Sequence, residues 1–159
     1  MFRRDLLPIV RPRPSDTGGL VYAEGLEENG RIIAGRVRSP RTGVAYEVKN
    51  GYLDLLGSHT GADNVANLTN FLPGAGRGYE PLWRVRSLSL LTGEPFPNER
   101  EIEIITGIVS PERGGLYLDL GCSAGLYTRS LSTNLGSGVA VGIDISPSML
   151  REAARRARA

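Results

Sequence analysis

Two carboxylates and two glycines in the second half of the chain have the types and spacing of a nucleotide-cofactor site. Gly121 and Gly125 bound a short turn, Asp119 precedes it, and Asp144 follows in the next apolar segment. Glycines let the backbone bend sharply and let a ligand approach without an intervening Cβ atom. A carboxylate at the end of the following strand can accept hydrogen bonds from both hydroxyls of a ribose.

These residues need a strand, a turn and a helix to position them, and the sequence predicts that order. Residues 116–120 are an apolar run that predicts a strand, and the glycine turn follows at 121–125. Residues 126–135 have helical spacing, with Gly136 where a left-handed cap is expected. The N–H groups that begin this helix point at the turn, which favours binding of a polar or anionic ligand group there.

A second strand and helix complete the expected unit. Residues 139–145 are nearly all apolar, which is typical of a parallel strand buried on both faces. Ser146 and Pro147 are a favourable N-cap and first-turn pair for a helix. Asp144 would therefore stand at the carboxyl edge of the sheet, where ligands bind in open α/β folds.

The sequence of the turn distinguishes between two cofactors. A dinucleotide fingerprint has the pattern G-x-G-x-x-G, whereas Ser123 occupies the middle position here. Asp119 would be poorly placed against a pyrophosphate and well placed to receive a cationic amino group. An NAD-dependent oxidoreductase is therefore the less favoured hypothesis.

Residues 118–125 and 142–150 together resemble the first two motifs of class I S-adenosylmethionine-dependent methyltransferases, closest to the type 11 branch related to the ubiquinone/menaquinone methyltransferases. The resemblance implies S-adenosyl-L-methionine as cofactor. It places the methionine part against Asp119, Gly121 and Gly125, the ribose on Asp144, and the adenine near Ile145 and Met149. The full set of implied cofactor-binding residues is Asp119, Gly121, Cys122, Ser123, Gly125, Asp144, Ile145 and Met149.

The resemblance extends over only the first two strands of such a fold. We therefore expect an α/β chain with an incomplete Rossmann-like methyltransferase fold, truncated before the region that would hold catalytic residues. Two parallel strands with their helices leave apolar faces uncovered. The alternative hypothesis is a truncated, non-catalytic binding module. The methyl acceptor stays open between a small molecule, a lipid quinone, RNA and protein.

The first part of the chain predicts a small β-rich module at 1–57, followed by a linker at 58–78 and the methyltransferase part at 79–159. Its expected strands are short, and Asn50-Gly51 is a pair typical of a tight hairpin turn. Residues 44–48 alternate between apolar and polar types, with Tyr46 and Val48 on one side. A short helix is expected within the linker, at Val65–Phe71. The expected strands of the module lie at 20–22, 31–37, 44–48 and 52–56.

Residues 39–56 are similar to the second knuckle of a Trm112-like zinc ribbon, a module that often precedes a methyltransferase domain. Ser39 and Thr42 fall on two cysteine positions, and Arg11–Pro14 falls where the first cysteine pair would lie. Zinc requires four N, S or O donors. We therefore expect a metal-free remnant of the ribbon.

Two helices are predicted before residue 116. In the first, at 79–91, Tyr79 or Arg84 could cover the cofactor or the substrate. We favour the alternative that Trp83 and the leucines dock this helix while its arginines are solvated. The second helix begins near Asn98. Its expected buried stripe is Ile102, Ile105 and Ile108, with Glu99, Arg100, Glu101 and Glu103 largely outside it.

The composition is that of a folded globular protein, with 40% hydrophobic and 23% charged residues and a net charge of +2. We find no clear nucleic-acid patch, because the charge is nearly balanced. One cysteine excludes an internal disulfide and a sulfur-rich metal site. No apolar run reaches the roughly 20 residues of a membrane helix, and no secretory signal is evident. A cytoplasmic location is expected by default; the oligomeric state is open.

Overall fold

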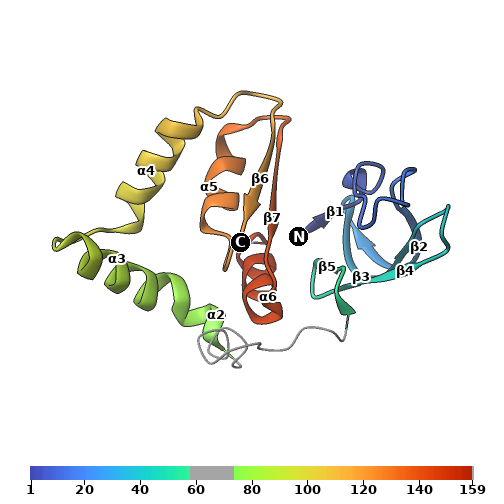
Figure 1. Ribbon diagram of the computed structural model, residues 1–159, viewed down its shortest axis with the longest axis horizontal. Helices are drawn as coiled ribbons and strands as arrows, with labels where there is room; N and C mark the ends of the chain where they lie inside the picture. The colour runs from blue at the N-terminus through green and yellow to red at the C-terminus, as the bar shows by residue number, and fades with distance from the viewer. Residues whose placement is uncertain (58–73, 159) are drawn as a thin grey trace. The chain divides into compact units, whose positions relative to one another are not determined.

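The computed structural model describes residues 1–57 and 74–158, and the chain is mixed α/β as expected (Figure 1). It divides into two compact units, with the boundary between Gly61 and Ala62. We call them the N-terminal unit and the C-terminal unit and describe each by itself. The helix expected at Val65–Phe71 lies outside the described residues. No helix of the described part is long and apolar enough to cross a membrane.

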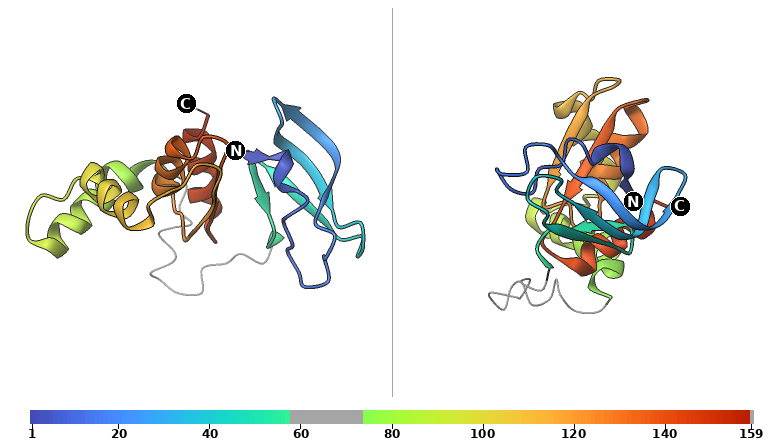
Figure 2. Two further views of the ribbon diagram at one scale, coloured as in Figure 1. Left: turned by 90° about the horizontal axis from the view of Figure 1, so that it is seen from above. Right: turned by 90° about the vertical axis from the view of Figure 1, so that its right-hand side faces the viewer.

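The N-terminal unit is one antiparallel sheet in which β3 is central, pairing with β1, β2 and β4, while β5 pairs with β4. Figure 2 shows the curl of this sheet. The strands are β1 (Phe2–Arg3), β2 (Val21–Glu28), β3 (Arg31–Arg38), β4 (Ala45–Lys49) and β5 (Tyr52–Asp54), and a 3-10 turn, η1, spans Arg4–Leu6.

Local turn chemistry joins these strands. Asn50 and Gly51 have φ of 53° and 81°, so the predicted hairpin between β4 and β5 is confirmed. Asn29 and Gly30 repeat the pattern between β2 and β3, with φ of 49° and 72°. Two-residue hairpins that match the strand twist need positive φ at both central residues, which Asn-Gly supplies at low cost.

The core of the N-terminal unit lies on one face of the sheet. Tyr46 and Val48 are both buried while Ala45 and Glu47 are exposed, so the predicted alternation is confirmed. Side chains two apart on a strand share a face, and this face is the apolar one. The buried apolar cluster comprises Leu7, Leu20, Ile32, Val37, Tyr46 and Val48.

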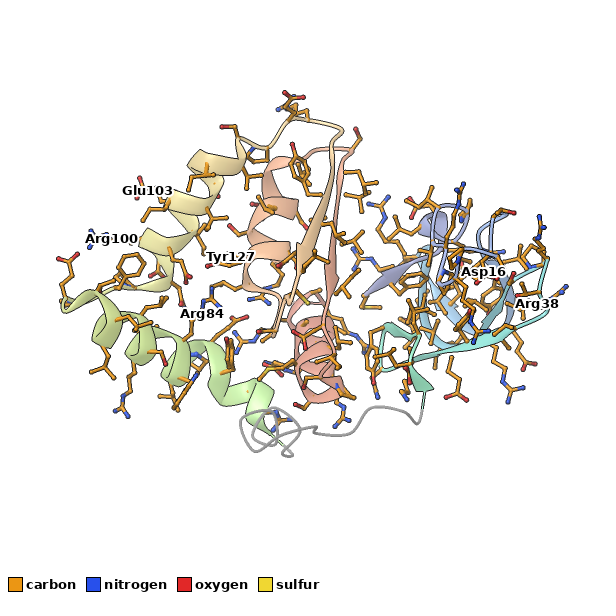
Figure 3. The ribbon with its side chains drawn as sticks, viewed as in Figure 1. Asp16, Arg38, Arg84, Arg100, Glu103 and Tyr127 are labelled. Carbon is orange, nitrogen blue, oxygen red and sulfur yellow. The ribbon has the colours of Figure 1, made fainter. Side chains whose placement is uncertain are left out.

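A buried carboxylate joins the loop before β2 to the β3–β4 turn. Asp16 is fully buried and accepts hydrogen bonds from the hydroxyls of Thr42 (2.9 Å) and Tyr46 (3.2 Å). A hydrogen bond from Ser39 is the main cause that lowers the pKa of Asp16, against the burial that would raise it. Ser39 also accepts the Thr42 N–H at 3.2 Å. A carboxylate therefore connects Ser39 and Thr42, the two positions that the zinc-ribbon resemblance assigns to metal ligands. Asp16 is labelled in Figure 3.

Replacing Asp16 with Asn should lower the melting temperature of the N-terminal unit by roughly 5 °C or more, because a buried charged acceptor is lost. The difference from the unsubstituted chain should persist above the pKa of an unfolded Asp, about 4. It should shrink as the pH falls through the lowered pKa of folded Asp16, where protonation removes the same charge. Thermal melts by circular dichroism at several pH values, with hydrogen exchange of β3 and β4 to assign the transition, measure this.

Asp5→Asn is the matched control. Its carboxylate pairs with Arg3 on the surface, where 60% of the Asp5 side chain is exposed, so little change is expected. A loss in Asp16→Asn that is independent of pH would contradict the assigned role of the charge.

The C-terminal unit contains two parallel strands, β6 and β7, paired from Leu116↔Val139 to Leu120↔Ile143. The predicted order of strand, helix, strand and helix over 116–156 is confirmed. Gly136 has φ of 59°, so the predicted left-handed position after the first of these helices is confirmed too. The elements are α2 (Ala75–Gly78), the π-helical η3 (Tyr79–Arg84), α3 (Val85–Thr92), α4 (Asn98–Val109), β6 (Leu116–Leu120), α5 (Leu126–Asn134), β7 (Val139–Ile143) and α6 (Pro147–Arg156).

The prediction that the second strand is buried on both faces is wrong. β7 is half-buried along most of its length, and Ile143 is 48% exposed. On β6, Tyr117 and Asp119 are half-buried, whereas the alternate leucines are 58–74% exposed. Successive side chains of a strand point to opposite faces, so one face of β6 is covered and the other is not. The exposed leucines are Leu116, Leu118 and Leu120.

Candidate functional site

The glycine turn is held against the end of β7 by backbone hydrogen bonds. The N–H groups of Gly121 and Cys122 both donate to the Ile143 carbonyl, at 2.8 and 2.9 Å. The Gly125 N–H donates to the Cys122 carbonyl at 2.7 Å and closes a β-turn. Ser123 is the first central residue of that turn and has φ of 48°. A left-handed residue is required there, a conformation that glycine adopts at lower cost than serine.

Asp144 connects the turn to α6. One of its carboxylate oxygens accepts the Ser123 N–H at 2.8 Å, and the other accepts the Ser146 N–H at 2.8 Å. Each carboxylate oxygen can accept a second hydrogen bond, and Asp144 is half-buried. The residue can therefore shape the turn and still accept the hydroxyls of a ribose.

Asp119 lies on the covered face of β6 and is tied to the first turn of α5. Its Oδ2 atom accepts the Thr128 N–H at 3.0 Å and the Thr128 hydroxyl at 2.6 Å. Thr128 was not among the residues that the sequence predicted for the site. The carboxylate is thus fixed next to the helix N-terminus, where negative charge is favoured.

Cys122 packs inside the C-terminal unit. It is 7% exposed, and burial raises the pKa of its thiol to about 12, with Asp144 and Asp119 adding to the effect. A thiol with this pKa is not a nucleophile at neutral pH.

The two residues expected near an adenine differ in exposure. Ile145 is 54% exposed and presents apolar surface just beyond β7. Met149 is 3% exposed on α6, so a ring could touch it only after neighbouring side chains moved. The structure gathers the remaining predicted residues around the ends of the two strands: Asp119, Gly121, Cys122, Ser123, Gly125 and Asp144.

Arg129 reaches the same turn and is held by Glu80, and both residues were missed by the sequence analysis. Glu80, on η3, is 4% exposed and accepts two hydrogen bonds from Arg129 Nη2, at 3.0 and 2.9 Å. Arg129 Nη1 donates to the Ala124 carbonyl at 2.6 Å. The available signal was that Arg129 follows Gly125 by four residues, which places them one above the other on a helix.

Arg84 and Glu101 form a largely buried ion pair, where both side chains were expected to be solvated. Arg84 donates to the Glu101 carboxylate through Nε and Nη2, at 2.8 and 2.7 Å, and lies over the Tyr127 ring (Figure 3). Only 16% of the Arg84 side chain and 12% of the Glu101 side chain is exposed. The predictions of a solvated Arg84 and of an outward Glu101 were therefore wrong. A guanidinium and a carboxylate can be buried together because two parallel hydrogen bonds offset their desolvation.

The predictions that Trp83 docks its helix and that Ile108 is buried are also wrong. Trp83 is 67% exposed and does not dock its helix. Ile108, expected in the buried stripe of α4, is 75% exposed, whereas Ile102 and Ile105 are half-buried. The ion pair between Arg84 and Glu101 joins η3 to α4 where apolar contact was expected.

Tyr127 stays neutral within this cluster. Burial and a hydrogen bond to Glu101 raise the pKa of Tyr127 to about 12. Burial by itself raises the pKa of Glu101, but hydrogen bonds from Arg84 and Tyr127 outweigh it and lower that pKa. The cluster therefore holds fixed charges at neutral pH. Among the described residues, no group of three His, Cys, Asp or Glu side chains could hold a metal ion.

A comparison with known families matches the segment that contains this site. Residues 118–159 match the model of a family described as a methyltransferase domain. The matched residues begin in β6 and include the glycine turn and Asp144. The match supports a methyltransferase domain and a general methyltransferase function. No curated protein matches the chain.

Gly142 has no room for a side chain. A Cβ atom there would lie 2.7 Å from Thr128 Oγ1 and 2.8 Å from Cys122 Sγ. We expect Gly142→Ala to lower the free energy of unfolding by about 1–3 kcal/mol, because the packing behind the turn must shift. Gly107→Ala is the control: its Cβ would meet open space on α4, so helix propensity should raise stability by about 0.5–1 kcal/mol. Urea unfolding measures both, and equal effects would contradict the crowding.

Cys122 is the chain's one cysteine, so thiol labelling reports on it alone. Near pH 8 we expect its reaction with an aromatic disulfide reagent to be slower than in urea-unfolded chain by on the order of a thousandfold, because the thiolate fraction is small. Rates within about tenfold of each other would show that the thiol is accessible and ionised.

Proposed function

We propose that the C-terminal unit carries the beginning of a class I, type 11-like methyltransferase fold of Rossmann-like architecture, and that its glycine turn binds S-adenosyl-L-methionine. The observation that carries the proposal is the hydrogen bond from the Ser123 N–H to Asp144. It places a strand-end carboxylate directly against the turn. The family match over residues 118–159 supports the same assignment.

The residues present suit the charges of this cofactor. Its sulfonium and amino groups are cationic, and Asp119 and Asp144 place two carboxylates at the ends of adjacent strands. Nothing lies within 4 Å of a Cβ atom added to Gly121, so a ligand can approach the backbone closely there. At Gly125 such an atom would lie 3.1 Å from Ala153 Cβ, so this glycine allows close packing against α6. Asp144 would receive the ribose hydroxyls, and the exposed Ile145 would contact the adenine.

When bound, the cofactor would supply a methyl group activated by the positive sulfur. The chain's own contribution is to hold and orient it, which is the larger part of catalysis in a displacement between two positioned reactants. Asp119 and Asp144 hold opposite ends of the cofactor in this proposal. The methyl acceptor is not assigned.

We further propose that the N-terminal unit is a zinc-ribbon-like module that does not use metal. The support is the Asp16 cluster, in which Ser39 and Thr42 occupy the expected ligand positions and are joined by a carboxylate. Hydrogen bonds to one buried charge then perform the cross-linking that a metal ion performs in a zinc site.

The proposed contact between Asp144 and the ribose can be tested by combining a substitution at Asp144 with removal of a ribose hydroxyl from the ligand. We expect the unsubstituted chain to bind S-adenosylhomocysteine and Asp144→Asn to bind it about tenfold more weakly. With the 2′-deoxy analogue, the same substitution should cost less, because the hydrogen bond in question is already missing. Isothermal titration calorimetry measures all four affinities.

Two results would count against the proposal. Equal cost of Asp144→Asn with both ligands would mean that the residue acts on the turn and not on the ribose. A larger thermal stabilisation by NADH than by S-adenosylhomocysteine would favour the dinucleotide alternative.

A further inference from the structure

Glu80 is a buried carboxylate held by two arginines from different helices. It accepts hydrogen bonds from Arg129 of α5 and from Arg156 of α6, the latter at 2.6 Å. The two arginine side chains are similarly exposed, at 25% and 24%. A carboxylate that is 4% exposed needs such partners, because an unpaired buried charge is strongly destabilising.

Only one of these two arginines is seen to contact the glycine turn. Arg129 Nη1 donates to the Ala124 carbonyl at 2.6 Å, and it lies 3.4 Å from the position of a Cβ atom added to Gly125. The other end of the same peptide group, the Gly125 N–H, donates to the Cys122 carbonyl at 2.7 Å. Both polar atoms of this peptide are therefore bound, which fixes its orientation.

The orientation of the Ala124–Gly125 peptide matters because Ser123, one residue earlier, is held in an uncommon backbone conformation. Ser123 has φ of 48°, and a non-glycine residue keeps such a backbone only where its surroundings enforce it. Asp144 holds the Cys122–Ser123 peptide by accepting a hydrogen bond from the Ser123 N–H. Arg129 holds the peptide after Ala124. Between them these two side chains fix the turn from both sides.

We propose that Arg129, held in place by Glu80, is a positioning residue that sets the shape of the glycine turn for cofactor binding. This inference rests on the proposed function. It adds that the turn depends on η3, an element that precedes both strands in the chain and supplies Glu80.

Arg129→Met and Arg156→Met form a matched pair for the test. Each removes one guanidinium from Glu80, and Arg156→Met also removes a partner of Glu152. Only Arg129→Met releases the Ala124 carbonyl. In the full chain, we expect Arg129→Met to raise the exchange rate of the Gly125 amide by about tenfold or more relative to Arg156→Met. We also expect it to weaken binding of S-adenosylhomocysteine by about tenfold relative to the same control. Melting temperatures without ligand show whether the two variants are equally stable.

The outcomes separate the inference from the proposed function. If the unsubstituted chain does not bind S-adenosylhomocysteine, the proposed function is wrong, and Gly125 exchange still decides whether Arg129 positions the turn. If the unsubstituted chain binds and both variants lose affinity equally, the inference is overturned. Faster Gly125 exchange with unchanged affinity would overturn it as well, because the cofactor would then tolerate a disordered turn.

Discussion

The carboxylate of Asp144 is the interaction on which the geometry of the C-terminal unit depends. It accepts one N–H from the glycine turn and one from the start of α6. This carboxylate lies just after β7, at the edge of the sheet. The carbonyl of Ile143, the residue before it, accepts two more hydrogen bonds from N–H groups of the turn. Strand, turn and helix therefore meet at two adjacent residues, and a ligand that binds there meets a preorganised surface.

Buried ion pairs join the helices that precede β6 to one another and to the rest of the unit. Glu80 on η3 pairs with arginines of α5 and α6, and Arg84 on the same segment pairs with Glu101 of α4. Desolvation of such groups is costly, so each pair is retained only with good geometry and several hydrogen bonds.

Local features were predictable and distant partnerships were not. Asn50-Gly51, Gly136 and Ser146 could be interpreted from sequence because their conformations depend on neighbouring residues. The burial of Glu80 and Arg84 could not, because each depends on partners 17 to 76 positions away. A charged residue in a helical pattern is more often solvated, and only the three-dimensional structure shows the exceptions.

The Asp16 cluster has a consequence for the chemical environments in which the N-terminal unit can persist. A module cross-linked by zinc thiolates unfolds when metal is withdrawn or when its sulfur atoms are oxidised. The Asp16 cluster joins its loops through hydroxyls around a carboxylate, and neither chelators nor peroxides attack these groups. Acidity is the condition that loosens such a cluster, because protonation of Asp16 removes the charge that its partners bind.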